Sequence, residues 1–228
     1  MSDATTHPFV IGLTGSIGAG KSTVARMLEE LGCIVSDSDQ LARAAFDDPE
    51  VKSEILRWWG SRVEGPSGVI DRSRVASIVF APPDASLAER IASERERARL
   101  EALIHPWIHA RRAAQFAAVP SGGAGVGAGD PRLKDKVCVI DAPLLLESKL
   151  LGECNTILFV DAPLSIRLAR VAASRGWTAD DLARRESAQM PLDQKRKFAD
   201  HVVINDSSLQ SLRAHIARLL SHILAQAR

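Results

Sequence analysis

The 228-residue sequence predicts a three-layer α/β fold, in which helices cover both faces of a five-stranded parallel sheet. Three observations lead to this prediction. Apolar runs end at glycine, aspartate or asparagine, as buried strands do. A strand, a helix and a second strand fit within about 30 residues, which is a βαβ unit. A long block without strand-like runs then separates this unit from the remaining strands. The length suits one domain, residues 1–228, that carries a subdomain.

The first βαβ unit opens the sheet. Residues 9–14 are a continuous apolar run that leads into glycines, which predicts a buried strand. Residues 21–31 have the apolar spacing of a helix, and Gly32 is a natural stop. A second strand is expected at residues 34–36.

The next block is helical. Residues 51–59 and 73–80 have helical spacing, and residues 88–116 form a long charged stretch that we expect to be broken or bent at Pro106. We therefore predict a helical insertion over about residues 40–118.

The α/β pattern resumes in the second half of the chain. Residues 120–135 include a segment with five glycines and are expected to be a flexible loop. The sheet core then comprises residues 8–39 and 137–228. Strands are expected at residues 137–140, 156–160 and 201–204, and helices at residues 163–174, 179–188 and 209–227.

Composition excludes several classes of protein. A net charge of +1 does not indicate a nucleic-acid binder. Cys33, Cys138 and Cys154 are far apart, which argues against disulfides and structural zinc. The N-terminus is polar and acidic, unlike a signal peptide, and no apolar run approaches the roughly 20 residues of a membrane span. We expect a cytoplasmic protein with no nucleic-acid, membrane or obligate protein partner.

The segment between the first strand and the first helix matches G-x-x-x-x-G-K-[ST], the P-loop pattern. Its glycines let backbone N–H groups point at phosphate oxygens, and the helix adds its positive end. Lys21 can bridge the terminal phosphates of ATP, and the Ser22 hydroxyl can ligate Mg²⁺. A mere tight turn is disfavoured by the strand before the loop and the helix after it. The predicted nucleotide contacts are Gly15, Ser16, Ile17, Gly18, Ala19, Gly20, Lys21, Ser22 and Thr23.

Other signatures narrow the class of P-loop protein. The sequence lacks the N-K-x-D and D-x-x-G strings of GTPases and the L-S-G-G-Q string of transporter ATPases. It therefore predicts a small-substrate phosphotransferase, which needs an acceptor site, a base for the acceptor hydroxyl and mobile arginines.

Along nearly its whole length, the chain resembles the dephospho-coenzyme A kinases. The order and spacing of the matching strings are specific, although each string is short. The strings are residues 11–25, Asp37-Ser-Asp39 with Ala42-Arg43, Asp71-Arg72, Ile104-His-Pro106, Pro143-Leu-Leu-Leu-Glu147, and Ala199-Asp200 with Ile204-Asn205.

The resemblance implies the P-loop NTPase fold with an acceptor subdomain that binds coenzyme A and a lid over about residues 164–190. It also implies ATP- and Mg²⁺-dependent phosphorylation of the ribose 3′-hydroxyl of dephospho-coenzyme A, the last step of coenzyme A synthesis. Two segments depart from the family pattern: residues 81–99 are longer, and residues 121–130 look inserted. Both lie between motifs, so they bear on loop shape.

Asp39 follows the second strand, at the edge of a parallel sheet where ligands bind. It can accept or position the proton of the acceptor hydroxyl, or cap the helix expected at residues 41–46. With the resemblance, we predict Asp39 as the base and Asp37 as its capping or supporting partner. The two roles could be exchanged.

Asp141 and Asp161 both end strands, so either can hold Mg²⁺ through water. Asp141 is preferred because it lies next to Pro143 and Leu144, which in the resembled family line the substrate cleft. Ser22 is the other predicted metal residue.

Arginines gather in the two helices after the fourth strand. A closing lid would bring their guanidinium groups to the transferring phosphoryl group, whereas a solvated charged face is the alternative. We predict Arg170 and Arg175 as catalytic and Arg185 as a nucleotide contact. The cluster comprises Arg167, Arg170, Arg175, Arg184 and Arg185.

The resemblance places Arg43, Arg72 and His105 on the coenzyme A moiety and Asn205 near the adenine. A structural histidine is the alternative for His105. With His109 it lacks a third ligand for zinc, so no metal is predicted there. Core packing is expected for the tryptophans of the insertion, with a wall for the pantetheine arm as the alternative: Trp58, Trp59 and Trp107.

Two other functions stay open from the sequence. One is another small-molecule kinase of the same fold. The other is a nucleotide-dependent binding protein without turnover, against which the arginine-rich lid and the missing GTPase strings weigh.

Overall fold

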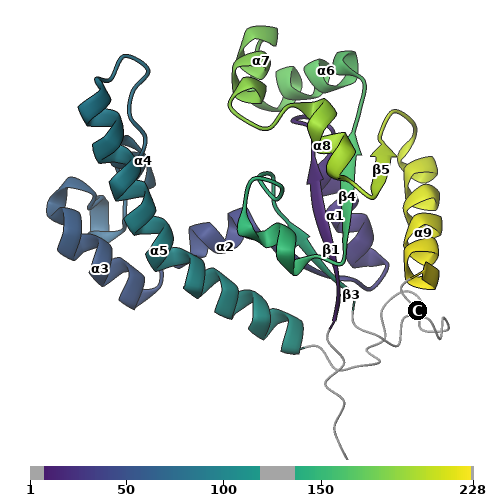
Figure 1. Cartoon of the computed structure of the whole chain (residues 1–228), viewed down its shortest axis with the longest axis horizontal. Coiled ribbons are helices and arrows are strands. Elements are labelled where there is room, and N and C mark those ends of the chain that lie inside the picture. Colours follow the sequence, from purple (N-terminus) through teal and green to yellow (C-terminus); the bar gives the residue numbers. More distant parts are fainter. Residues whose placement is uncertain (1–7, 119–136, 227–228) are drawn as a thin grey trace, which may run out of the picture. The chain divides into compact units, whose positions relative to one another are not determined.

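The computed structural model describes residues 8–118 and 137–226. Its sheet has five strands in the order β2-β3-β1-β4-β5, and every neighbouring pair is parallel. Figure 1 labels β1, β3, β4 and β5 of this sheet. The predicted five-stranded parallel sheet is confirmed. The segment 120–135, expected to be a flexible loop, lies entirely outside the described residues. The strands are β1 (Phe9–Gly15), β2 (Ile34–Asp37), β3 (Val137–Asp141), β4 (Thr156–Asp161) and β5 (His201–Ile204).

The strand order places the P-loop at the centre of the sheet. β1 lies between β3 and β4, and the chain leaves β1 for the edge strand β2 before it returns to β3. The order of the strands therefore reverses beside the carboxyl end of β1. Such a switch point leaves a crevice beyond the strand ends, where ligands of open α/β sheets bind.

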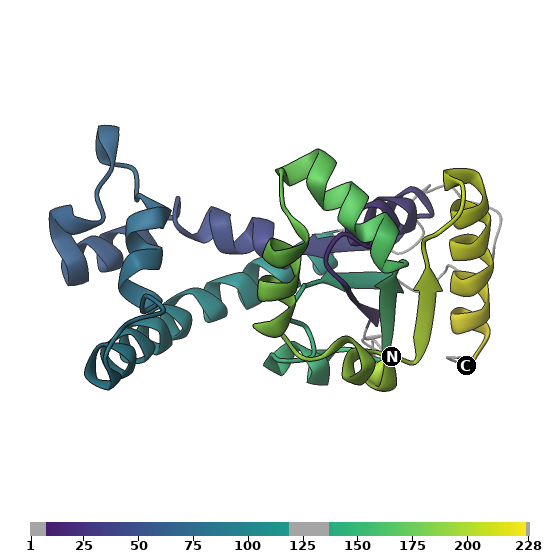
Figure 2. The same cartoon turned by 90° about the horizontal axis from the view of Figure 1, so that it is seen from above.

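One face of the sheet is covered by α1 (Lys21–Glu30) and α9 (Leu209–Gln226). Ile11, Leu13 and Leu158 point to this face and pack with Leu28 of α1 and Ile216 of α9. Both views show α9 alongside β5, at the edge of the sheet (Figures 1 and 2).

The opposite face packs against a loop and short helices. Cys138 and Ile140 of β3 bury Leu145 and Leu146, which follow that strand. The cover is completed by η4 (Lys149–Glu153) and by Met190 and Ala199, which flank α8 (Leu192–Phe198). Since both faces are covered, the strands are continuous apolar runs rather than alternating ones.

Between β4 and β5 the chain forms three helices. The two predicted ones are found as α6 (Leu164–Arg175) and α7 (Ala179–Ser187). A capping box fixes the start of α7, because the Thr178 hydroxyl accepts from the Asp181 N–H and the Asp181 carboxylate accepts from the Thr178 N–H. The third helix, α8, was not predicted.

Residues Ser38–Ala114 form a compact unit of their own. An apolar core that includes Ile55, Val75 and Ile104 holds its helices together. The helices are α2 (Ser38–Ala45), α3 (Pro49–Trp59), α4 (Arg72–Val79) and the main part of α5 (Leu87–Ala118), with the 3₁₀ turns η1 (Gly60–Arg62) and η2 (Pro66–Gly68).

The helix was expected to be broken or bent at Pro106. The break is wrong, because α5 runs through this residue as one helix, and the bend stays a prediction. Proline has no N–H for the carbonyl of Ala102, four residues earlier. Ala102 and Pro106 are both exposed, so water can take the place of the lost donor. In the described ranges, no helix is both long and apolar enough to span a membrane.

Candidate functional site

The P-loop joins β1 to α1 through two glycines of positive φ, Gly18 at 79° and Gly20 at 90°. The loop is bound to the neighbouring strand β4, because the Ser16 N–H donates to the Val160 carbonyl over 3.0 Å. At position 20 a Cβ atom would lie 2.4 Å from Nδ2 of Asn205, so only glycine fits there.

The loop leaves a set of backbone donors available. Within the described part of the chain, no protein acceptor receives the N–H groups of residues 17, 18, 20, 21 and 22. The last two belong to the first turn of α1, which adds the positive end of the helix. Unpaired N–H groups of a loop at the start of a helix are an arrangement that can bind an anion such as phosphate.

Lys21 forms an ion pair with Asp141, the last residue of β3. The register of the sheet explains why Lys21 and Asp141 meet. Asp141 pairs with Leu13, whose side chain lies in the core beneath α1, so the Asp141 carboxylate points to the face from which Lys21 rises. Asp37 pairs with Asp141 and shares that face.

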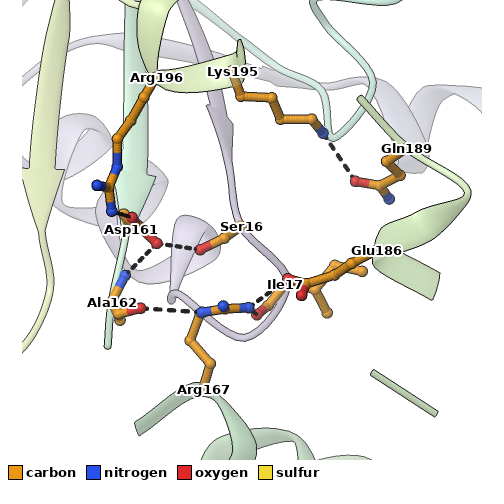
Figure 3. A network of polar contacts seen from close by, with 9 residues as sticks. All are labelled: Ser16, Ile17, Asp161, Ala162, Arg167, Glu186, Gln189, Lys195 and Arg196. Atoms are coloured by element: carbon orange, nitrogen blue, oxygen red, sulfur yellow. Dashed lines mark hydrogen bonds and ion pairs between the residues drawn. The ribbon is translucent and has the colours of Figure 1, made fainter. Parts of the chain in front are cut away.

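Asp161 ends β4 with its side chain on the opposite face. Its Oδ1 accepts from the Ser16 hydroxyl at 2.7 Å and from the Ala162 N–H at 2.8 Å, and Oδ2 pairs with Arg196 of α8 (Figure 3). Burial by itself would raise the pKa of Asp161, but the hydrogen bonds from Arg196, Ser16 and Ala162 outweigh it and hold the pKa below its usual value. Of the two strand-end aspartates, Asp161 is therefore bound by Ser16, Ala162 and Arg196, whereas Asp141 contacts the P-loop lysine.

Arg170 and Asn205, both predicted site residues, hold the P-loop from outside. Nη1 of Arg170 and Nδ2 of Asn205 donate to the Ala19 carbonyl over 3.1 and 2.7 Å. Nη2 of Arg170 also donates to the Asn205 carbonyl over 3.2 Å. Asn205 is buried, and its side-chain amide lies against the loop.

Arg167 also contacts the P-loop, although the sequence did not single it out within its own cluster. It is only 5% exposed. Its Nε donates to the Ala162 carbonyl over 3.1 Å and its Nη1 to the Ile17 carbonyl over 3.3 Å, while Nη1 also pairs with Glu186 of α7 (Figure 3). An arginine on an amphipathic helix is ordinarily solvated, so no sequence signal separated Arg167 from its neighbours.

The remaining arginines of the cluster are exposed. Arg175 and Arg185 both stack on the Trp177 ring, with their guanidinium carbons 4.6 and 4.0 Å from its centroid. Arg184 pairs with Asp181 on the same helix. Two of the predicted lid residues are thus brought together on one indole between α6 and α7.

A second buried cation links α8 to the loop after β3. Lys195 is fully buried, and its ammonium donates to Oε1 of Gln189 over 2.9 Å (Figure 3). The same ammonium lies 3.3 Å from Oε1 of Glu147. The same Glu147 oxygen accepts from the Met190 N–H over 3.0 Å. These contacts hold the segment that begins at Pro143 against α8.

The predicted acceptor residues belong to two parts of the chain. Pro143 lies beside the P-loop strand, because its carbonyl accepts from the Thr14 hydroxyl over 3.3 Å, and Leu144 next to it is exposed. In the unit 38–114, Arg43, Arg72 and His105 are all exposed on its helices. Trp59 is buried in the core of this unit, and Trp58 and Trp107 pack against that core.

Asp39 is exposed and is the second residue of α2. The helix therefore starts three residues earlier than expected, and the carboxylate sits in its first turn, immediately after β2. Both Asp37 and Asp39 stay within two residues of the carboxyl end of that strand.

Comparison with known proteins gives a consistent family match. The dephospho-CoA kinase family model matches residues 9–211. A dephospho-CoA kinase of Deinococcus radiodurans is 37% identical, over 96% of this chain and 94% of its own length. A dephospho-CoA kinase of Corynebacterium glutamicum is 35% identical, over 95% of this chain and 98% of its own length.

Solved structures share the fold. A protein of Thermus thermophilus superposes with a TM-score of 0.73 at 32% identity, covering 98% of this chain and 100% of its own. The dephospho-CoA kinase of Campylobacter jejuni has a TM-score of 0.54 at 19% identity, covering 94% of this chain and 96% of its own.

Proposed function

The chain belongs to the dephospho-CoA kinase family, and from this premise we propose that it transfers the γ-phosphoryl group of ATP directly to the ribose 3′-hydroxyl of dephospho-coenzyme A. The observation that carries the proposal is the P-loop. Its inward N–H groups and the Lys21 ammonium provide the positive surroundings that a triphosphate needs. The products are coenzyme A and ADP, and no covalent intermediate on the enzyme is required.

Lys21 has the central electrostatic role. Its ammonium exchanges Asp141 for the β- and γ-phosphates when ATP binds, so its positive charge offsets part of the negative charge of the phosphates. Asp39, at the first turn of α2, accepts or orients the proton of the attacking hydroxyl. Asp37 supports it. Arg175 and Arg185, released from Trp177, supply positive charge as the phosphoryl group transfers, together with Arg170.

Mg²⁺ fits the donors that this site offers. Hard oxygen ligands suit it, and it keeps several waters, so one hydroxyl and one carboxylate suffice beside the phosphates. The Ser22 hydroxyl is exposed at the start of α1, and Asp141 lies at the end of the neighbouring strand. When bound, Mg²⁺ neutralises charge on the phosphate oxygens. No group of three or more acidic, histidine or cysteine ligands occurs in the described residues, in keeping with a site completed by ATP.

The acceptor is held by the remaining predicted residues. Arg43, Arg72 and His105 are proposed to contact the coenzyme A moiety, and Pro143 and Leu144 to line the cleft. The unit 38–114 is thereby the acceptor subdomain and residues 164–190 the lid. The cytoplasmic location stays a prediction from the sequence.

The decisive experiment measures ADP release from ATP and Mg²⁺ with several acceptors in parallel. Dephospho-coenzyme A alone should stimulate release strongly, and coenzyme A should appear in equal amount. Adenosine, AMP, shikimate and a blank without acceptor serve as controls. Stimulation by one of these instead would leave a phosphotransferase with another acceptor, and no stimulation at all would point to a nucleotide-binding protein.

A further inference from the structure

The backbone of the P-loop presents carbonyl groups outward and N–H groups inward. A trans peptide is planar, and its C=O and N–H bonds point in opposite directions. A donor that fixes the carbonyl of one residue therefore also fixes the direction of the next residue's N–H. Two carbonyls of the loop, those of Ile17 and Ala19, are held in this way by side chains.

The peptide between Ile17 and Gly18 depends on one side chain. Within the described residues, the Ile17 carbonyl has a single side-chain donor, Nη1 of Arg167. Gly18 has a φ of 79°, and a Cβ there would lie 2.9 Å from the Arg167 carbonyl, so α6 closely limits this turn. The N–H of Gly18 points away from Arg167, into the cradle.

Arg167 is itself fixed from both sides. Its Nε is held by the Ala162 carbonyl at the end of β4, and its Nη1 by Glu186 near the end of α7 (Figure 3). The Arg167 side chain is 6% exposed and that of Glu186 is 20% exposed, so the ion pair is shielded from water and salt. A shift of α7 would pull on the guanidinium that sets the Gly18 N–H.

From these contacts we propose that Arg167 is a positioning residue for phosphate binding and that Glu186 couples its guanidinium to α7. This inference deepens the proposed function and rests on it, since α7 belongs to the proposed lid. The P-loop then presents its N–H groups correctly only while α7 is seated, which links nucleotide affinity to the lid.

Two conservative variants test the roles of Arg167 and Glu186 separately. Arg167→Lys keeps the positive charge, but one ammonium cannot reach the Ala162 and Ile17 carbonyls and Glu186 together. Glu186→Gln keeps the size and an acceptor oxygen but removes the charge. Arg213→Gln is the matched control, because it breaks an exposed arginine–glutamate pair with Glu30 between α9 and α1.

Titration calorimetry with ADP gives the first readout. We expect the Kd of ADP to rise about tenfold in Arg167→Lys and about threefold in Glu186→Gln, because misaligned hydrogen-bond donors bind the phosphates less well. Arg213→Gln should bind ADP like the wild type. In steady-state kinetics, KM for ATP should rise while KM for dephospho-coenzyme A stays unchanged.

A second readout observes the loop directly. The ¹H–¹⁵N signal of Gly18 should shift in Arg167→Lys, and its response to ADP should shrink. Wild-type ADP affinity in Arg167→Lys would overturn the proposal, as would an equal rise of both KM values, which a merely structural role predicts. If Arg167→Lys does not fold, Glu186→Gln decides alone: weaker ADP binding supports the coupling, and unchanged binding refutes it.

The calorimetric readout does not depend on the acceptor. ADP binding is measured without dephospho-coenzyme A, so the variants can behave as expected even if the acceptor proves to be another molecule. In that case the proposed function fails and the positioning role stands.

Discussion

At the scale of single residues, the aspartates at the carboxyl ends of β3 and β4 point to opposite faces of the sheet and have different partners. Lys21 meets Asp141 on the face beneath α1, whereas Asp161 meets Ser16 and Arg196 on the other side. This difference follows from strand parity, because consecutive side chains of a strand point to opposite faces.

Replacing Lys21 with alanine should abolish phosphoryl transfer. The Lys21 ammonium is the one basic side chain of the P-loop segment. Losing the positive charge that stabilises the negative charge developing on the phosphates in the transition state costs about a thousandfold or more in kcat. The measurement is single-turnover transfer from ATP to dephospho-coenzyme A. A loss below tenfold would contradict the central role of Lys21.

Replacing Asp39 with asparagine should lower kcat about a hundredfold or more, since a general base contributes this much. ATP affinity should stay unchanged, because Asp39 belongs to α2 and not to the P-loop. Asp37→Asn is the matched variant two residues earlier. If Asp37→Asn loses turnover and Asp39→Asn keeps it, the two roles are exchanged.

Asp161 should contribute to stability in a pH-dependent way. Its pKa in the folded protein is held below the ordinary value of about 3.9. The stabilisation is therefore present in full above the unfolded pKa and is lost as pH falls through the lowered folded pKa. Urea unfolding of wild type and Asp161→Asn should give a free-energy difference that is constant above about pH 5 and shrinks toward pH 3. A difference independent of pH would contradict this assignment.

At the scale of elements, Lys195 is the one buried side chain of α8, and it holds this helix against the loop after β3. Lys195→Ala should destabilise the protein by about 3 kcal/mol, because it removes a buried cation from Glu147 and leaves a cavity. Lys197→Ala, two residues further on and exposed, should change the free energy of unfolding by less than about 0.5 kcal/mol. Equal effects of the two substitutions on chemical unfolding would show that burial of Lys195 contributes nothing.

The same helix shows where sequence reasoning stops. The strands were predictable because their apolar runs are buried on both faces, and α6 and α7 because their apolar residues are regularly spaced. Helix α8 has seven residues, and its buried position is a lysine, so no apolar period marks it. The order of the strands was not predicted, since pairing joins residues that are distant in sequence and leaves no local pattern.

The site divides in a similar way. The P-loop motif could be predicted because local backbone geometry dictates its glycines. Arg167 and Arg196 could not be assigned, because the carbonyl of Ile17 and the carboxylate of Asp161 that they contact lie more than thirty residues away in the sequence. The roles of Asp39 and the acceptor residues remain predictions.

At the scale of the whole molecule, the core protects its thiols. Burial, and then the neighbouring Cys138 thiol, raises the pKa of Cys33 to about 12. At pH 8 almost no Cys33 thiolate exists, so Cys33 should react with a thiol reagent only when the core opens. The half-buried Cys154 should react much faster. Mass spectrometry of partly labelled protein tests this, and equal labelling of Cys33 and Cys154 would contradict it.

The side-chain donors to Ala19 have a consequence for synthesis. The P-loop motif leaves the ribosome early, but Arg170 and Asn205, which hold the Ala19 carbonyl, lie 151 and 186 residues later in the chain. A nascent chain that ends before Asn205 contains the whole motif yet lacks part of what shapes it. Such a chain should not bind ATP until Asn205 has emerged from the ribosome, so nucleotide binding becomes possible late in synthesis rather than when the motif first appears.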